Sequence, residues 1–198
     1  VLALISGAAV SLYYAVSEAR AHALAERHAA EFAAVNRFLN TMLVSADPAH
    51  TRGRAVTVVE TLDAARTQLP VDRSLTPDTR AALAATLSNT YVALGDVEPG
   101  LAIARDARTT TERALGANSE AAIRLRLAEA SALHFAAELK AGNALLEPFT
   151  QQAIPWGEDP RLRLQLRAEY ATALVYMGED ERALQALQKL QAEATATL

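Results

Sequence analysis

The first 16 residues, VLALISGAAVSLYYAV, carry no charge, and a polar boundary follows at Ser17 and Glu18. A helix needs about 20 apolar residues to cross a bilayer, so this run is slightly short by itself. Tyr13 and Tyr14 lie close to the polar boundary, where aromatic residues gather at a membrane interface. We predict that residues 1–16 are the C-terminal part of a transmembrane helix that starts upstream of Val1. A buried core helix is the alternative.

The helical pattern continues through residues 17–45, which contain neither glycine nor proline, and we expect a linker helix there. A stripe of apolar residues is spaced alternately by three and four positions, as in a heptad seam: Phe32, Val35, Leu39 and Met42. This stripe either packs on the helices that follow or pairs with the same stripe of a second copy. A homodimer is therefore one of two open interpretations.

Residues 46–76 contain clear helix start and stop signals. Thr57 and Glu60 have the T-x-x-E spacing of a capping box, which predicts a helix over 58–69. Thr76 precedes a proline, a combination that caps and begins a further helix. We assign this segment to one capped helix and the loops that lead into the rest of the chain.

Signals of the same kind recur at a fixed distance further along. Pro77 and Pro160 each stand where a helix would begin, and Gly95 and Gly178 where one would end, with 83 residues between the members of both pairs. A repeat length of half that distance is typical of solenoids built from pairs of helices. We predict three tetratricopeptide-like (TPR-like) repeats, at residues 77–116, 117–157 and 158–198.

The first and third repeats match the TPR pattern of large and small residues well. The matching residues are Leu87, Tyr91, Gly95 and Gly100 in the first repeat, and Tyr170, Leu174, Gly178 and Ala183 in the third. The middle repeat is degenerate: Leu139 stands where glycine is usual, and Pro148 falls inside its second helix. The predicted fold class is all-α, with a long N-terminal membrane and linker helix followed by a TPR-like solenoid of helical hairpins.

Composition and charge narrow the function classes. The chain has no cysteine, which excludes a disulfide framework, thiolate metal sites and a cysteine nucleophile. The net charge of −4 gives no reason to expect nucleic acid as a partner. The four histidines lack the H-E-x-x-H spacing of a zinc protease, and no nucleophile, base and acid form a set. We expect no catalytic residue, metal or cofactor in this chain, so a hydrolase ranks last among its functions.

The most specific motifs lie between residues 35 and 95. They are VNRFL at 35–39, ML at 42–43, ADP at 46–48, GR at 53–54, VTVVETLDAA at 56–65, RAAL at 80–83, TL at 86–87, TY at 90–91 and LG at 94–95. This pattern resembles bacterial transmembrane serine/threonine protein kinases with C-terminal TPR repeats. It is similar to the segment that follows their membrane helix and to their first repeat. Ser88 and Ser119 depart from the pattern, which usually has glycine and a His-Pro pair at these places.

The resemblance implies a kinase domain upstream of Val1, which would use ATP and Mg²⁺. This chain contains no glycine-rich phosphate loop, H-R-D or D-F-G, so it would not itself be an enzyme. The resemblance also implies a single-pass protein of the inner (cytoplasmic) membrane. Its repeats would lie on the periplasmic, extracytoplasmic side and act as a sensor.

In TPR arrays the first helix of each pair lines a concave groove that binds a protein or peptide. The repeat positions predict seven groove residues: Asn89, Arg126, Glu129, Leu133, Gln165, Thr172 and Tyr176. We expect an extracytoplasmic sensor region that binds a partner there and signals through the membrane helix; the alternative is a membrane-anchored TPR scaffold without a kinase in cis. Reversing the charges of Arg126 and Glu129 is expected to weaken partner binding without unfolding the chain.

Overall fold

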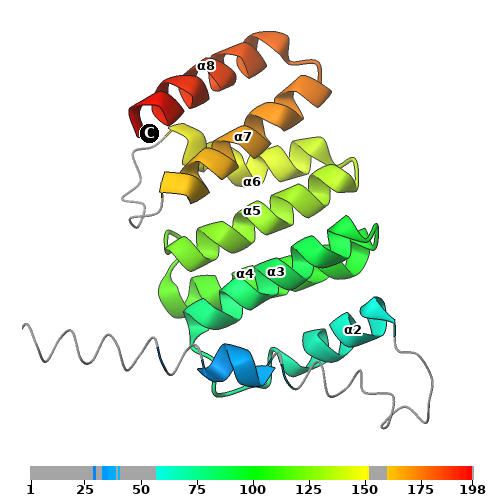
Figure 1. Cartoon of the computed structure of the whole chain (residues 1–198). Helices are drawn as coiled ribbons and strands as arrows, with labels where there is room; N and C mark the ends of the chain where they lie inside the picture. Colours follow the sequence, from blue (N-terminus) through cyan, green and yellow to red (C-terminus); the bar gives the residue numbers. More distant parts are fainter. Residues whose placement is uncertain (1–28, 30–32, 39, 41–56, 152–159, 198) are drawn as a thin grey trace, which may run out of the picture.

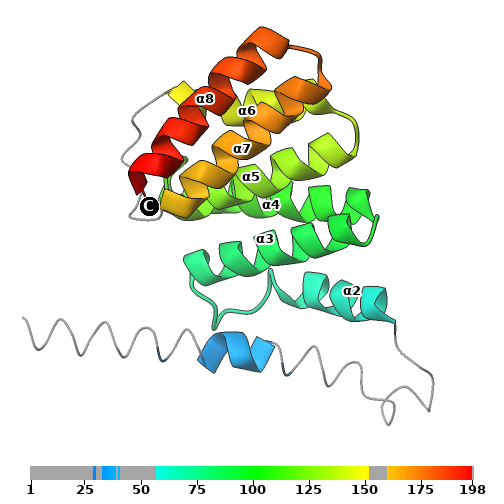
Figure 2. The ribbon, with the colours of Figure 1, turned by 45° about the horizontal axis from the view of Figure 1, so that its top comes forward.

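The computed structural model describes residues 29, 33–38, 40, 57–151 and 160–197. Its helices are α2 (Val58–Gln68), α3 (Pro77–Ala93), α4 (Val97–Leu115), α5 (Glu120–Phe135), α6 (Leu139–Gln151), α7 (Pro160–Tyr176) and α8 (Asp180–Thr197). They stack in chain order, with α2 at one end and α8 at the other (Figures 1 and 2). Every regular element in these ranges is a helix, which confirms the all-α prediction.

The predicted membrane segment at residues 1–16 and most of the predicted linker helix at 17–45 lie outside the described residues. In the part of the chain that the structure covers, no helix combines the length and the apolar character that crossing a bilayer requires. The membrane helix therefore stays a prediction.

Val35 is the only residue of the predicted dimer seam that the structure describes, since Phe32, Leu39 and Met42 fall outside it. Val35 is half-buried in a helical stretch at residues 33–38. Ala34 and Phe38, on the same stretch, are buried in one apolar cluster with Leu62 of α2. The face of this stretch that carries Ala34 and Phe38 thus packs on the helices that follow. Whether the predicted stripe itself packs there or pairs with a second copy stays a prediction.

The predicted helix starts are confirmed in atomic detail. The Thr57 backbone N–H donates to Glu60 Oε2 at 2.9 Å, and the Glu60 N–H donates to Thr57 Oγ1 at 3.2 Å, which completes the capping box of α2. At α3 the Thr79 N–H donates to Thr76 Oγ1 at 3.2 Å, and Pro77 is the first helical residue. These side chains satisfy backbone donors that the helix itself leaves free.

Tyr91 ties α3 to α2. Its ring is fully buried, and its hydroxyl donates a hydrogen bond to Asp63 Oδ1 at 2.7 Å. Burial, and next the bond to the Asp63 carboxylate, raises the pKa of the Tyr91 hydroxyl well above its usual range. The hydroxyl therefore keeps the proton that it donates across this interface.

The two helices of each hairpin meet at small residues. A Cβ added to Gly100 of α4 would lie 2.8 Å from the carbonyl oxygen of Ser88 in α3, and one added to Gly142 of α6 would lie 2.9 Å from that of Ala130 in α5. In the third hairpin two buried alanines, Ala171 and Ala183, hold the corresponding positions. Any larger side chain at the two glycines would push the helices apart.

The register predicted for the middle repeat is wrong by two residues. The turn between α5 and α6 places Ala137 at φ 63°, as the other two hairpin turns place Gly95 at 84° and Gly178 at 72°. Leu139, which was assigned to this position, instead begins α6. The glycine signal failed here because an alanine adopts the left-handed conformation that normally selects glycine.

Replacing Ala137 by glycine is expected to raise the free energy of unfolding by about 0.5–1 kcal/mol. A left-handed conformation costs alanine roughly 1–2 kcal/mol, and glycine removes this cost. Glycine also makes the unfolded chain more flexible, which offsets about 0.4–1 kcal/mol of the gain. Urea unfolding followed by circular dichroism measures the change. The neighbouring Ala136, at φ −74°, is the matched control, where the same substitution should destabilise. Destabilisation by both variants would contradict the strain at Ala137.

Pro148 lies inside α6 without ending it. The helix continues to Gln151, and Leu146 and Phe149 on either side of the proline are buried in the second apolar cluster. At 13 described residues α6 is shorter than α4 with 19 or α8 with 18. Burial of the flanking apolar side chains offsets the hydrogen bond that proline cannot donate.

Candidate protein-binding groove

A groove of about 690 Å³ runs across the first helices of the three hairpins, α3, α5 and α7. Its lining combines alanines, larger apolar side chains, and polar or charged side chains. The lining residues are Ala82, Ala85, Thr86 and Asn89 from α3, Arg124, Leu127, Ala128 and Ser131 from α5, and Arg161, Leu162, Gln165, Ala168, Glu169 and Thr172 from α7. The prediction that first helices form the groove is therefore correct for all three hairpins.

Three of the seven predicted groove residues lie in this lining. Asn89 of α3 and Gln165 and Thr172 of α7 are exposed there. They belong to the first and third repeats, whose turn glycines had set the register correctly. The structure brings them together on one surface, and their role in binding remains a prediction.

The three residues predicted from α5 lie elsewhere. Leu133 is buried, and Glu129, at 3% exposure, is buried as well. Arg126 is largely covered and stacks over the Phe149 ring of α6, with its guanidinium carbon 4.7 Å from the ring centre. Shifting the register by two residues explains all three errors, because Arg124, Leu127 and Ser131 then occupy the groove positions.

Glu129 and Arg126 are part of an ion-pair network between α4 and α5. Glu129 accepts hydrogen bonds from Arg108 Nε at 2.6 Å and from Arg105 Nε at 3.1 Å. Arg108 also donates to Glu112 at 3.0 Å, and Arg126 pairs with the same carboxylate. These residues join two hairpins and present no free charge to the groove.

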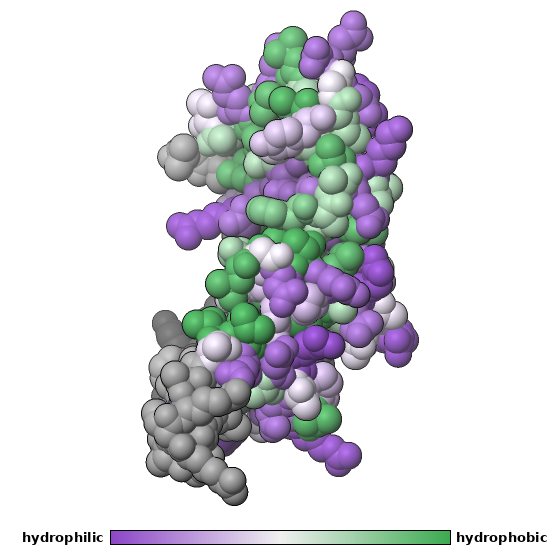
Figure 3. Space-filling view, turned by 90° about the vertical axis from the view of Figure 1, so that its right-hand side faces the viewer, coloured by the Kyte–Doolittle hydropathy of each residue, from purple (hydrophilic) through white to green (hydrophobic). Residues whose placement is uncertain are grey.

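Tyr176 lies at the end of α7, beside the hairpin turn, and does not line the groove. Its side chain is 75% exposed, and Leu94 and Phe135 are exposed next to the other two hairpin turns. These turns lie on the edge of the stack that faces the viewer in Figure 3, where hydrophobic and hydrophilic side chains are intermixed. The groove lining on α7 ends at Thr172, one turn before Tyr176, so the prediction for Tyr176 is not met.

Three charged residues that the repeat positions did not predict also line the groove: Arg124, Arg161 and Glu169. Glu169 Oε1 lies 2.7 Å from His134 Nδ1, so this pair links α7 to α5 at the groove wall. Arg124 forms a partly exposed ion pair with Glu120 one turn earlier on α5. The glycine at position 142, set equivalent to Gly100, would have revealed the correct register and with it Arg124.

The groove can bind a chain through its backbone. Ala82, Ala85, Ala128 and Ala168 leave room for a ligand main chain to approach, and the amide and hydroxyl groups of Asn89, Ser131, Gln165 and Thr172 can donate and accept hydrogen bonds. Three charged side chains also line the groove: Arg124, which pairs with Glu120, Glu169, which pairs with His134, and Arg161. Within the described residues, no group of three or more His, Asp or Glu side chains is arranged to hold a metal ion.

No family model matches the chain, and no curated protein matches it significantly. Among solved structures, it is similar to a putative kinesin light chain from Podosopora anserina described as having nearly identical TPR-like repeats. The two agree with a TM-score of 0.55 at 20% sequence identity over 70% of this chain, and the match spans 66% of the other chain. At this identity the likeness shows the fold alone: the helical hairpins form a TPR-like repeat array.

Proposed function

We propose that this chain is a protein-interaction module whose groove on α3, α5 and α7 binds an extended segment of a partner protein. The observation that carries the proposal is the lining itself, in which an alanine floor is bordered by uncharged polar side chains from three successive hairpins. Such a surface can bind a peptide main chain without a deep apolar pocket.

The size of the groove sets the length of the bound segment. Packed helices lie roughly 8–10 Å apart, so the path from α3 across α5 to α7 is about 20 Å. An extended chain advances about 3.3 Å per residue, which corresponds to about six residues.

A displayed library of random 12-residue peptides, selected on the whole 198-residue chain, tests the proposal. Peptides recovered from it should bind the double variant Asn89→Ala, Gln165→Ala at least about tenfold more weakly, because each lost hydrogen bond contributes about 1 kcal/mol and 1.4 kcal/mol is a factor of ten. Titration calorimetry measures the dissociation constants. Ala168→Trp, which fills the floor, should abolish binding.

Gln188→Ala is the matched control, since Gln188 is an exposed amide on α8 away from the groove. It should leave binding unchanged. If peptides selected on the chain bind Ala168→Trp as tightly as the original protein, the groove is not the binding site.

We further propose that the module is the extracytoplasmic sensor of a membrane-bound serine/threonine kinase. The resemblance of residues 35–95 to such kinases supports this, and the TPR-like fold agrees with the repeats that follow the membrane helix in that family. Partner binding in the groove would then be transmitted through the linker helix to the kinase domain.

Sequencing about 300 codons upstream of Val1, enough for one large domain, tests the kinase proposal separately. A glycine-rich loop, H-R-D and D-F-G are expected there. A short basic start directly before the apolar segment would instead favour a membrane-anchored TPR scaffold. Either result leaves the groove proposal to its own experiment.

A further inference from the structure

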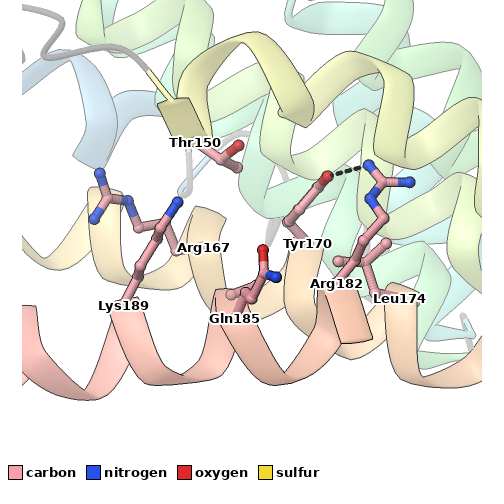
Figure 4. Close-up of a pocket in the computed structure, with 8 residues that line it drawn as sticks. Thr150, Arg167, Tyr170, Leu174, Arg182, Gln185 and Lys189 are labelled. Atoms are coloured by element: carbon pink, nitrogen blue, oxygen red, sulfur yellow. Dashed lines mark hydrogen bonds between the residues drawn. The ribbon is translucent and has the colours of Figure 1, made fainter. Parts of the chain in front are cut away.

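A second, smaller hollow lies between α6, α7 and α8, outside the groove. It has a volume of about 110 Å³ and is lined by Thr150, Arg167, Tyr170, Leu174, Arg182, Gln185, Ala186 and Lys189. In Figure 4, Gln185 and Lys189 rise from α8 toward Thr150 on α6, and Arg167 lies beside Lys189. Tyr170 and Arg182 close the other side, where Arg182 Nη2 donates to the Tyr170 hydroxyl at 2.8 Å.

The repeat supplies an internal comparison for this place. Arg167 and Tyr170 of α7 correspond to Arg126 and Glu129 of α5, 41 residues earlier in both cases. Between α4, α5 and α6 the carboxylate of Glu129 is held by guanidinium groups of α4. Between α6, α7 and α8 the arginine is retained, but a phenol replaces the carboxylate.

The residues that line the hollow carry an excess of positive charge. Three of the lining residues are cationic and none is acidic. Arg167 pairs with Glu193, and Arg182 pairs with Glu147 and Glu179. Lys189 has no hydrogen-bond or ion-pair partner among the described residues, and the neutral lining groups of Thr150 and Gln185 can also donate hydrogen bonds.

We propose that this hollow binds a carboxylate group beside the Tyr170 phenol, the residue that stands where the repeat before it has the carboxylate of Glu129. Lys189 supplies the unbalanced charge, and Gln185 and Arg167 supply donors beside it. The volume suits a single such group rather than a large molecule. The carboxylate belongs either to a small free acid or to an acidic side chain of a partner protein, and both offer the same chemistry.

The lysine content of the chain makes the test specific, because Lys140 and Lys189 are its only lysines. Reductive methylation with ¹³C-formaldehyde keeps the charge of both lysines and labels their amines for NMR, and Lys→Arg variants assign the two lysine signals. Titration with succinate, or with a short peptide containing glutamate, should shift the Lys189 signal saturably and leave Lys140 unchanged. A response to succinate indicates a free acid, and a response to the peptide alone indicates a partner side chain.

Two exposed glutamines of α8 provide matched variants. Gln185→Glu places a carboxylate in the hollow and should weaken the added ligand at least tenfold, while Gln188→Glu makes the same charge change outside the lining and should preserve binding. Sodium chloride at equal ionic strength must not reproduce the shift. Equal shifts at Lys140 and Lys189, no saturable shift at Lys189, or tighter binding of inorganic phosphate than of either carboxylate would overturn the proposal.

Discussion

Replacing Glu129 by alanine is expected to lower the free energy of unfolding by about 3 kcal/mol, the low end of what breaking a buried ion pair costs. The Glu129 carboxylate is almost fully buried and accepts hydrogen bonds from both Arg108 and Arg105. Without it, the largely covered Arg108 guanidinium loses its nearest counter-charge, and only Glu112 remains as a partner. Urea unfolding of the whole chain measures the effect.

Glu120→Ala is the matched control, because Glu120 forms a partly exposed ion pair with Arg124 on the same helix. Pairs of this kind contribute about 0.3–0.5 kcal/mol. Equal destabilisation by the two variants would show that the Glu129 network adds no stability to the α4–α5 interface.

Because Arg126 and Glu129 both belong to this ion-pair network, reversing their charges is expected to unfold the chain. This expectation is contrary to the prediction made from the sequence.

Replacing Gly100 by leucine is expected to destabilise the first hairpin by about 3 kcal/mol, the upper range for an overpacked core. A Cβ at this position would lie 2.8 Å from the Ser88 carbonyl oxygen and 3.0 Å from Val92 Cγ2. A backbone carbonyl inside α3 cannot move without breaking the helix, so α3 and α4 would have to separate. Thermal and urea unfolding both report the loss.

Ala102→Leu is the control, since Ala102 is exposed on the same helix two residues later. Surface substitutions of this kind usually change stability by less than about 0.5 kcal/mol. If Gly100→Leu is no more destabilising than Ala102→Leu, then the close approach of α3 and α4 does not limit the side chain at position 100.

Local signals along the chain predicted the helices with good accuracy. The capping box at Thr57 and the cap at Thr76 place two helix starts correctly, because both depend on hydrogen bonds within three residues. The glycines at 95 and 178 place two hairpin turns for a similar reason, since φ at those positions is a local property. The repeat array follows from these signals together with their 83-residue spacing.

The middle repeat shows where local signals fail. Its turn holds Ala137 in a left-handed conformation, which is unusual for alanine and could not be expected from the residue type. The predicted register of this repeat was therefore wrong by two residues. Two residues correspond to a rotation of roughly 200° around a helix. A register error of this size therefore assigns buried residues to the groove face. Arg126 and Glu129 were assigned to the wrong surface for this reason.

The residue pattern was enough to predict that this chain forms helical hairpins, where most of them begin and end, and that the first helix of each hairpin lines a groove. Which charged residues are buried could be read only from the packing of the helices. The partners of Glu129 lie 21 and 24 residues away on another helix, and the burial of a charge depends on such distant partners rather than on its neighbours in sequence. The hollow beside Lys189 likewise exists only where α6, α7 and α8 meet.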